Sequence, residues 1–341
     1  MCMQRNGTIH GLRSLCNTAA VPLHHSTPLL PSTALEAELG LPVWLKFESA
    51  QPSASFKLRG MGLAAERAVE RGATQLVSSS GGNAGYAVAW AGRSLGVPVT
   101  VVVPSTTGSR MRGLIASTGA EVRVAGTVWD EAHAEATALA AATGGALLHP
   151  FDHPDIWEGH ASLVAEVADE GVVPACVVVA VGGGGLLCGV LQGMDAAGWS
   201  DTPVVAVETE GAASFAAAQQ AGAPVTLPRI DTLALTLGAK RVCGRVVELA
   251  KHRDVQSVLV SDAAAVTACN RFLDDHRVLV EPSCGAALSA VYDRHPLVLA
   301  SGGPVLVVVC GGAAVTREQL AGWMANVDNH TTPTPAAQEI V

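Results

Sequence analysis

The sequence predicts an α/β fold with mostly parallel sheets, and three features support this prediction. Short runs rich in valine and other apolar residues alternate with longer alanine-rich stretches. The short runs are apolar at consecutive positions, which is typical of strands covered by helices on both faces. Glycine-rich turns follow several runs and lead into helical patterns, as at the ligand-binding edge of an open α/β sheet.

The individual elements follow from this alternation of apolar runs and helical patterns. The candidate strands are Val43–Phe47, Gln75–Ser78, Val99–Val103, Glu121–Val124, Val177–Val181, Val204–Glu208, Ser257–Val260 and Val305–Val309. The candidate helices include Ala84–Leu95, Trp129–Ala142, His160–Glu170, Leu187–Ala196 and Ala263–Asp274.

The elements form two groups, which predicts two three-layer α/β/α domains. Residues 51–153 form a small domain, and residues 154–328 form a large domain that residues 21–50 complete. The ends, 1–20 and 329–341, are expected to be loosely ordered. Residues 1–20 contain no acid and carry Arg5 and Arg13, a weak resemblance to a transit peptide. We expect a simple extension there.

Composition excludes several classes of protein. The formal net charge is −9, and no cluster of Lys and Arg is mixed with aromatic residues, so nucleic acid is not expected as a partner. The apolar runs are strand-sized, so no membrane span is expected. The eight cysteines contain no CxxC pair, and several lie in apolar runs, as reduced cysteines of a cytoplasmic protein do.

The segment Ser53–Gly60 contains a candidate nucleophile, Lys57, between Phe56 and Leu58. Burial beside apolar side chains lowers the pKa of a lysine and makes its amine reactive towards an aldehyde. Taken alone, a lysine is more often a solvated surface residue.

The turn Ser78–Gly85 closes one strand and opens the next helix. Its glycines, Ser80 and the amide groups of the helix start could hold a carboxylate. An ordinary turn with Asn83 as helix cap is an equally good interpretation.

Two further glycine turns follow buried strands. Gly182–Gly185 lies between a strand and a helix, where four glycines can form a nest for a phosphate, although a flexible linker is the alternative. Cys310 precedes Gly311 and Gly312 at the end of another strand, where its sulfur could meet a ring nitrogen or be a core residue.

Together and in this order, the motifs resemble the fold-type II pyridoxal-phosphate family (the tryptophan synthase β-like fold), specifically its L-serine/L-threonine dehydratase branch. The resemblance covers residues 25–325, including segments at 151–162 and 208–212. The matching motifs are SxSFKxRG at Ser53–Gly60, SGGNAG at Ser80–Gly85, GGGGLL at Gly182–Leu187, EPSCGAAL at Glu281–Leu288 and VCGG at Val309–Gly312.

The resemblance implies pyridoxal 5'-phosphate as cofactor, held by Lys57 as a Schiff base, with Lys57 also moving the α-proton. Phe56 would pack on the cofactor ring, Asn83 would bond its 3′ oxygen and Cys310 would face its nitrogen. A thiol does not keep that nitrogen protonated as an aspartate would, which favours direct β-elimination. The phosphate ligands would be Gly182, Gly183, Gly184, Gly185 and Leu186. The substrate carboxylate ligands would be Ser80, Gly81, Asn83 and Ala84.

A monovalent cation such as K⁺ is also implied near the phosphate loop. Its ligands would be Glu208 with backbone oxygens of Gly182, Ala212, Leu237 and Ala239, and a strand-end acid in water is the alternative for Glu208. Three histidines, His149, His153 and His160, lack a fourth metal ligand at standard spacing and are interpreted as loop residues.

Two positions depart from the family pattern. Ala54 stands where the family often has glycine, which affects the turn before Lys57. Gly81 stands where some dehydratases have alanine, which leaves more room beside the substrate and bears on turnover and on the choice between serine and threonine.

The expected function is that of a lyase of amino-acid catabolism, an L-serine/L-threonine ammonia-lyase acting as a homodimer. It would convert L-serine to pyruvate, or L-threonine to 2-oxobutanoate, with release of ammonia. The alternatives are another reaction on the same fold (serine racemase, cysteine synthase or threonine synthase type) and a non-catalytic cofactor-binding protein.

Overall fold

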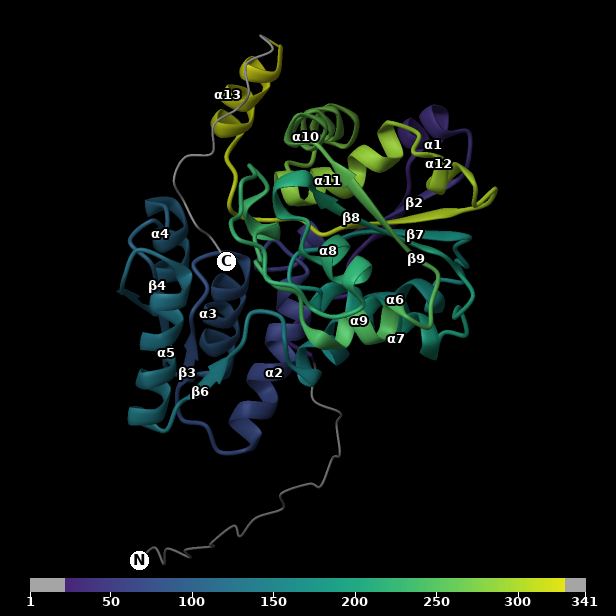
Figure 1. Cartoon of the computed structure of the whole chain (residues 1–341). Helices are drawn as coiled ribbons and strands as arrows, with labels where there is room; N and C mark the ends of the chain where they lie inside the picture. The colour runs from purple at the N-terminus through teal and green to yellow at the C-terminus, as the bar shows by residue number, and fades with distance from the viewer. Residues whose placement is uncertain (1–21, 329–341) are drawn as a thin grey trace, which may run out of the picture.

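The computed structural model describes residues 22–328, which form two sheets, each covered by helices (Figure 1). The larger sheet has the order β1-β2-β10-β7-β8-β9, and all its pairs are parallel except β1 with β2. Its strands are β1 (Leu29–Pro31), β2 (Val43–Phe47), β7 (Cys176–Ala180), β8 (Val204–Thr209), β9 (Val255–Val260) and β10 (Val305–Val309). Every residue of β7, β8 and β10 is buried, as expected for strands with helices on both faces.

The smaller sheet is parallel throughout and has the order β5-β4-β3-β6. Its strands are β3 (Leu76–Ser78), β4 (Val99–Val103), β5 (Glu121–Val124) and β6 (Ala146–Leu148). Residues between 76 and 148 therefore supply one sheet, and residues on both sides of this segment supply the other. The predicted α/β class with mostly parallel sheets is confirmed, while the domain limits at 51 and 153 stay a prediction.

Helices fill the connections between the strands. Around the smaller sheet lie α2 (Lys57–Glu70), α3 (Asn83–Leu95), α4 (Ser109–Ser117) and α5 (Trp129–Thr143). The larger sheet is joined by α1 (Thr33–Leu39), α6 (Pro154–Asp169), α7 (Gly185–Ala196), α8 (Ser214–Ala221), α9 (Gly244–Ala250), α10 (Asp262–His276), α11 (Pro282–Tyr292), α12 (Pro296–Leu299) and α13 (Arg317–Asp328). Short 3₁₀ turns lie at η1 (Glu48–Ala50), η2 (Glu210–Ala212) and η3 (Leu235–Leu237).

The two groups of helices meet where α2 crosses α6. A Cβ atom built on Gly159 of α6 would stand 2.7 Å from the Cα of Gly60 in α2. Only glycine at these two positions lets the helix backbones approach so closely. The start of α2, which carries Lys57, is thereby fixed against the helix layer of the larger sheet.

All the predicted strands are present, with ends shifted by at most two residues. The named candidates did not include β1 and β6, which are three residues long, nor the helices α1, α2, α4, α8, α9, α11, α12 and α13. The loop assignment is wrong for His160, which lies in α6, and His153 is the N-cap of that helix. The expected loose ends, with Cys2 and Cys16, lie outside the described residues.

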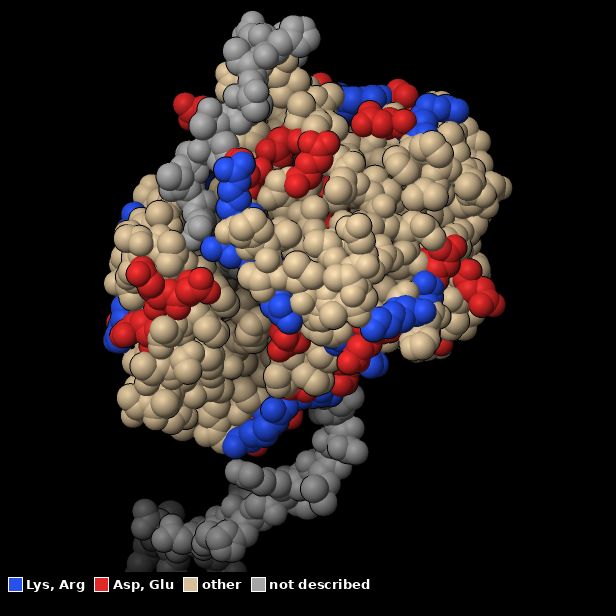
Figure 2. All heavy atoms as spheres, in the orientation of Figure 1, with Lys and Arg blue, Asp and Glu red and all other residues tan. Residues whose placement is uncertain are grey.

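The visible surface carries scattered charges. Figure 2 shows Lys and Arg interspersed with Asp and Glu on this face, with no continuous basic area. Among the described residues, no helix combines the length and the apolar character needed to span a bilayer.

Candidate active site

One cavity gathers the sequence motifs at the carboxyl ends of strands from both sheets. The cavity and its mouth hold about 730 Å³ of empty space, lined from the Lys57 segment, the turn after β3, the turn after β7 and the end of β10. Helix starts and backbone amides collect at this edge of an α/β sheet, which is why ligands bind there. Segments far apart in the sequence thus form one site.

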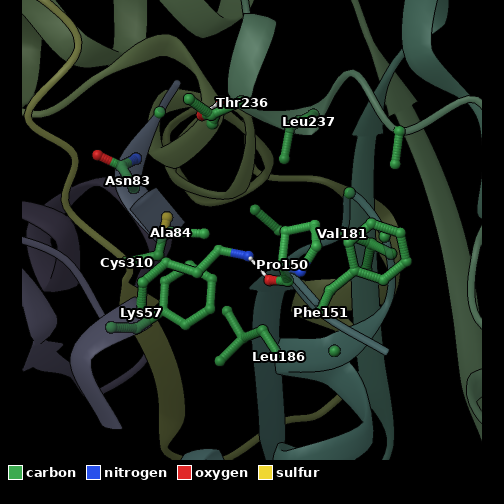
Figure 3. A pocket seen from close by; sticks show the side chains of 18 of the residues that line it. Lys57, Asn83, Ala84, Pro150, Phe151, Val181, Leu186, Thr236, Leu237 and Cys310 are labelled. Atoms are coloured by element: carbon green, nitrogen blue, oxygen red, sulfur yellow. Dashed lines mark hydrogen bonds between the residues drawn. The ribbon is translucent and has the colours of Figure 1, made fainter. Parts of the chain in front are cut away.

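Lys57 is the first residue of α2, and its side chain points into the cavity (Figure 3). Its Nζ donates a hydrogen bond to the carbonyl oxygen of Pro150 at 2.7 Å. Burial lowers the pKa of the amine to about 8, although the charge of the nearby Glu281 carboxylate opposes this shift. The interpretation of Lys57 as a solvated surface residue is wrong, because the amine is surrounded by the walls of the cavity.

The turn before Lys57 rests on the end of β10. The N–H of Phe56 donates to the carbonyl of Cys310 at 3.2 Å, and the N–H of Gly312 donates to the carbonyl of Ala54 at 2.8 Å. These bonds set Lys57 beside Cys310. Ala54 adopts a φ of 59°, a left-handed conformation that favours glycine and costs an alanine about 1 kcal/mol. The departure from the family pattern at this position therefore introduces local strain.

Phe56 also lines the cavity, and its ring packs against His160 with centroids 4.9 Å apart. His160 is fully buried, and burial lowers its pKa well below 6.5, so it is a neutral packing partner. His149 is engaged elsewhere: its Nδ1 accepts the N–H groups of Phe151 and Asp152. Within residues 22–328, no group of His, Cys, Asp and Glu is arranged to hold a metal ion.

The four-glycine turn forms the opposite wall of the cavity. Gly184 has a φ of 88° and caps α7, so the turn ends at the positive end of a helix. Gly182 to Gly185 and Leu186 all line the cavity. Phe151 covers the turn so closely that a Cβ on Gly183 would stand 2.3 Å from its ring. The turn is therefore a fixed part of the site, and the flexible-linker interpretation is wrong.

The packing of Gly183 leads to a testable expectation. Gly183→Ala forces the Phe151 ring to move, so we expect the free energy of unfolding to fall by about 1–3 kcal/mol. The matched control is Gly113→Ala in α4, where a Cβ meets no atom within 4 Å. Urea unfolding of both variants measures the difference. Equal stability of Gly183→Ala and wild type would contradict this account of the turn.

The turn after β3 brings Ser80, Asn83 and Ala84 to the cavity. Gly82 caps α3, and Asn83 is its first residue, so the interpretation of Asn83 as a simple helix cap is wrong. The Asn83 side chain instead reaches across to the other half of the molecule. Its Nδ2 donates to Glu281 Oε1 at 2.8 Å, and its Oδ1 accepts the N–H of Ala313 at 3.0 Å.

Gly81 lies in the same turn, but it borders Thr107 and not the cavity. A Cβ at this position would stand 2.5 Å from Thr107 Oγ1. An alanine at position 81 would therefore need Thr107 to move. Glycine is the residue that this arrangement of the turn accepts.

Cys310 lies at the end of β10 and lines the cavity next to Lys57 (Figure 3). A hydrogen bond with Cys284, together with burial, raises the pKa of its thiol well above 9. Its sulfur is therefore a neutral group at neutral pH. Six cysteines of the described part of the chain are free and buried, as expected for core thiols.

The residues proposed for a cation divide between two places. Gly182, Leu237 and Ala239 line the cavity, whereas Glu208 and Ala212 lie behind it, fully buried. The interpretation of Glu208 as an acid in water is wrong, because its carboxylate accepts the N–H groups of Phe215 and Ala216 at 2.7 and 2.8 Å. Burial raises the pKa of Glu208 to about 7.

Several residues of the cavity were not assigned from the sequence. These additional lining residues are Glu281, Thr236, Ser283, Pro150 and Phe151. Glu281 and Ser283 belong to the EPSCGAAL motif, and Pro150 and Phe151 lie at the edge of another matching segment, so position within a motif was the available signal. Thr236 had no such signal.

Comparisons with known proteins find relatives over most of this chain. Residues 21–311 match the model of a family described as pyridoxal-phosphate dependent enzyme. A mouse protein named serine dehydratase-like is 50% identical over 88% of this chain and 94% of its own length. The human L-serine dehydratase/L-threonine deaminase is 46% identical over the same shares. A fungal L-serine ammonia-lyase from Rhizomucor miehei has a similar structure, with a TM-score of 0.86 and 37% identity, covering 90% of this chain and all of the fungal one.

Proposed function

Because the chain belongs to the pyridoxal-phosphate dependent enzyme family, we propose that it deaminates L-serine and L-threonine by β-elimination. The observation that carries the proposal is the buried Lys57 amine, facing a four-glycine turn across one cavity. The overall reaction converts L-serine to pyruvate and ammonia, and L-threonine to 2-oxobutanoate and ammonia. The elimination releases one water molecule, and the later hydrolysis that frees ammonia consumes one.

The residues present fit pyridoxal phosphate. A turn without side chains at the start of α7 suits a phosphate, and a lysine whose pKa is lowered to about 8 suits an aldehyde. Gly182 to Gly185, with Leu186, would hold the phosphate, and Phe56, Asn83 and Cys310 would surround the ring. When bound, the cofactor supplies an aldehyde for the substrate amine and an electron sink for the carbon that loses its hydrogen.

The protein side of the reaction consists of binding and proton transfer. Ser80, Asn83 and Ala84 would hold the substrate carboxylate at the start of α3, because the first turn of a helix favours anions, and Gly81 would shape this turn. Lys57 would take the α-hydrogen of the substrate, because its amine lies inside the cavity and ionises near neutral pH. The neutral Cys310 thiol would leave the ring nitrogen unprotonated, which favours elimination over reactions that need a stronger electron sink.

We also propose a monovalent cation, such as K⁺, near Glu208, with Gly182, Ala212, Leu237 and Ala239 supplying backbone oxygens. Support comes from a buried carboxylate behind the glycine turn and from the contact of Gly182 with Leu237, whose carbonyl oxygen would stand 3.4 Å from a Cβ at position 182. A homodimer in the cytoplasm is proposed from the family resemblance. The buried free cysteines fit the reducing compartment that this location provides.

The test is the formation of 2-oxo acids. Purified protein with pyridoxal phosphate should release pyruvate from L-serine and 2-oxobutanoate from L-threonine, each with an equal amount of ammonia. Replacing Na⁺ in the buffer by K⁺ should raise the rate of 2-oxo acid formation if the cation site is as proposed. Formation of D-serine or of thioether products in place of 2-oxo acids would contradict the assignment.

A further inference from the structure

Glu281 places a carboxylate in the wall of the cavity, and none of the binding or proton-transfer steps proposed above uses it. It precedes α11 as its N-cap residue, and the side chain is only 4% exposed. A buried carboxylate is costly unless polar partners stabilise it, so its contacts indicate why it is tolerated there. One partner, Asn83, belongs to α3 beside the smaller sheet and lies 198 positions away in the sequence.

The contact with Glu281 fixes which way the Asn83 amide faces. Asn83 Nδ2 donates to Glu281 Oε1 at 2.8 Å, while Asn83 Oδ1 accepts the N–H of Ala313 at 3.0 Å. A reversed amide would set oxygen against carboxylate and NH₂ against N–H, so both contacts become repulsive. An amide nitrogen carries two hydrogens, and Glu281 uses one of them. The other is left to donate to a ligand in the cavity.

Glu281 is itself held firmly. Thr236 Oγ1 donates to Glu281 Oε1 at 2.5 Å and also forms a hydrogen bond with Ser283. Gly312 covers the carboxylate on its far side, where a Cβ would stand 1.9 Å from Glu281 Cδ. Any larger residue at position 312 would displace the carboxylate. The acceptor for Asn83 is therefore rigid, and it links α3 to both α11 and the end of β10.

We propose that Glu281 is a positioning residue, which fixes the Asn83 amide as a hydrogen-bond donor towards the bound cofactor and joins α3 to the wall of the larger sheet. The inference rests on the proposed function, since it concerns how this chain holds pyridoxal phosphate. Glu281 would act through Asn83 and would not itself contact the reacting atoms.

Two substitutions separate placement from charge. Glu281→Gln keeps an oxygen at Oε1 that accepts from Asn83 and Thr236, so the Asn83 amide stays in place. Glu281→Ala removes that acceptor and frees the amide to reverse. Affinity for pyridoxal phosphate should therefore fall about 10- to 100-fold in Glu281→Ala, as for loss of a hydrogen bond to a charged group. The affinity of Glu281→Gln should stay within about threefold of that of wild type.

The experiment is a double-mutant cycle in which cofactor-free protein is titrated with pyridoxal phosphate and the dissociation constant is read from protein fluorescence. Because Glu281 acts through Asn83, Asn83→Ala should lower affinity as Glu281→Ala does, and the double variant should bind within about twofold of the weaker single variant. Ser289→Ala is the matched control, since it removes a buried hydroxyl of α11 that bonds only within the helix. Its affinity should equal that of wild type.

Two results would overturn the inference: losses that multiply in the double variant, or a Glu281→Gln variant that binds as weakly as Glu281→Ala. If Glu281→Ala does not fold, Glu281→Leu takes its place in the cycle, because leucine fills a similar space and also lacks the acceptor. Glu281→Leu should then bind pyridoxal phosphate about 10- to 100-fold more weakly than wild type, and binding as tight as that of Glu281→Gln would reject the inference. Wild-type protein that fails to bind pyridoxal phosphate contradicts the proposed function as well.

Discussion

Replacing Lys57 by alanine is expected to abolish turnover of L-serine and the yellow absorbance of the purified protein together. The amine at position 57 is the lysine nitrogen that lines the cavity, and both the covalent hold on the cofactor and the proton transfer are assigned to it. A positioned acid–base group contributes up to about 10⁴-fold to a rate, so kcat should fall by at least this factor. Steady-state assay of 2-oxo acid and an absorbance spectrum measure the two effects.

The control for this substitution is Lys251→Ala, which removes an exposed lysine and should change neither property. A Lys57→Ala protein that stays yellow would mean that another amine holds the cofactor. A colourless variant with wild-type turnover would remove Lys57 from the reaction. Either result would contradict the assignment.

The pKa of Lys57 adds a pH dependence to the same prediction. Because burial lowers this pKa to about 8, the amine of cofactor-free protein is protonated and unreactive below pH 8 and neutral above it. Uptake of pyridoxal phosphate should therefore quicken about tenfold per pH unit up to pH 8 and level off above it. The charge of Glu281 opposes the effect of burial, so Glu281→Gln should move the midpoint to lower pH. Stopped-flow absorbance follows the uptake, and a midpoint near 10 would contradict a buried amine.

The second large effect is expected from Arg59, which stabilises the chain two residues beyond Lys57. Its side chain is fully buried and forms ion pairs with Glu48 of η1 at 2.7 Å and with Glu166 of α6 at 2.6 Å. Lys46 of β2 adds a bond to Glu166 at 2.5 Å. Although burial alone would raise it, the hydrogen bonds from Arg59 and Lys46 and their charges lower the pKa of Glu166 to about 2.

Arg59→Met would leave these carboxylates without their shared cation in the interior. Removing one partner of a buried ion pair typically costs about 3–5 kcal/mol, so we expect a loss of this size in the free energy of unfolding. Because the network ties the start of α2 to η1 and α6, affinity for pyridoxal phosphate should also fall. Urea unfolding at pH 7 and cofactor titration measure the two losses.

Arg67→Met is the matched control within the same helix. Arg67 is 30% exposed and pairs with Asp155 and Glu158 near the surface, where an ion pair contributes about 1 kcal/mol or less. Equal destabilisation by the two substitutions would show that burial of the Arg59 network has no special effect. Arg59→Lys keeps the charge but loses the planar fork, so an intermediate loss is expected.

The sequence by itself determined the fold class and the motifs of the site. Buried parallel strands such as β7 and β10 are apolar at every position, so their pattern is visible without knowledge of their neighbours. The glycine turns and the Lys57 segment were also recognisable, because each is a short local signal. The order of these motifs along the chain was sufficient to indicate the family.

Only the tertiary structure decided which side chains face one another. The strands β1 and β6, three residues each, are defined by pairing with β2 and β3, and not by a pattern of their own. The bond of Glu281 to Asn83 and the network of Arg59 join residues separated by up to 198 positions. Such contacts depend on how whole elements pack, and burial then shifts the pKa values of Lys57 and Glu281 to about 8 and about 7. Local sequence carries no record of that packing, which is why the chemistry of the site emerges from the fold.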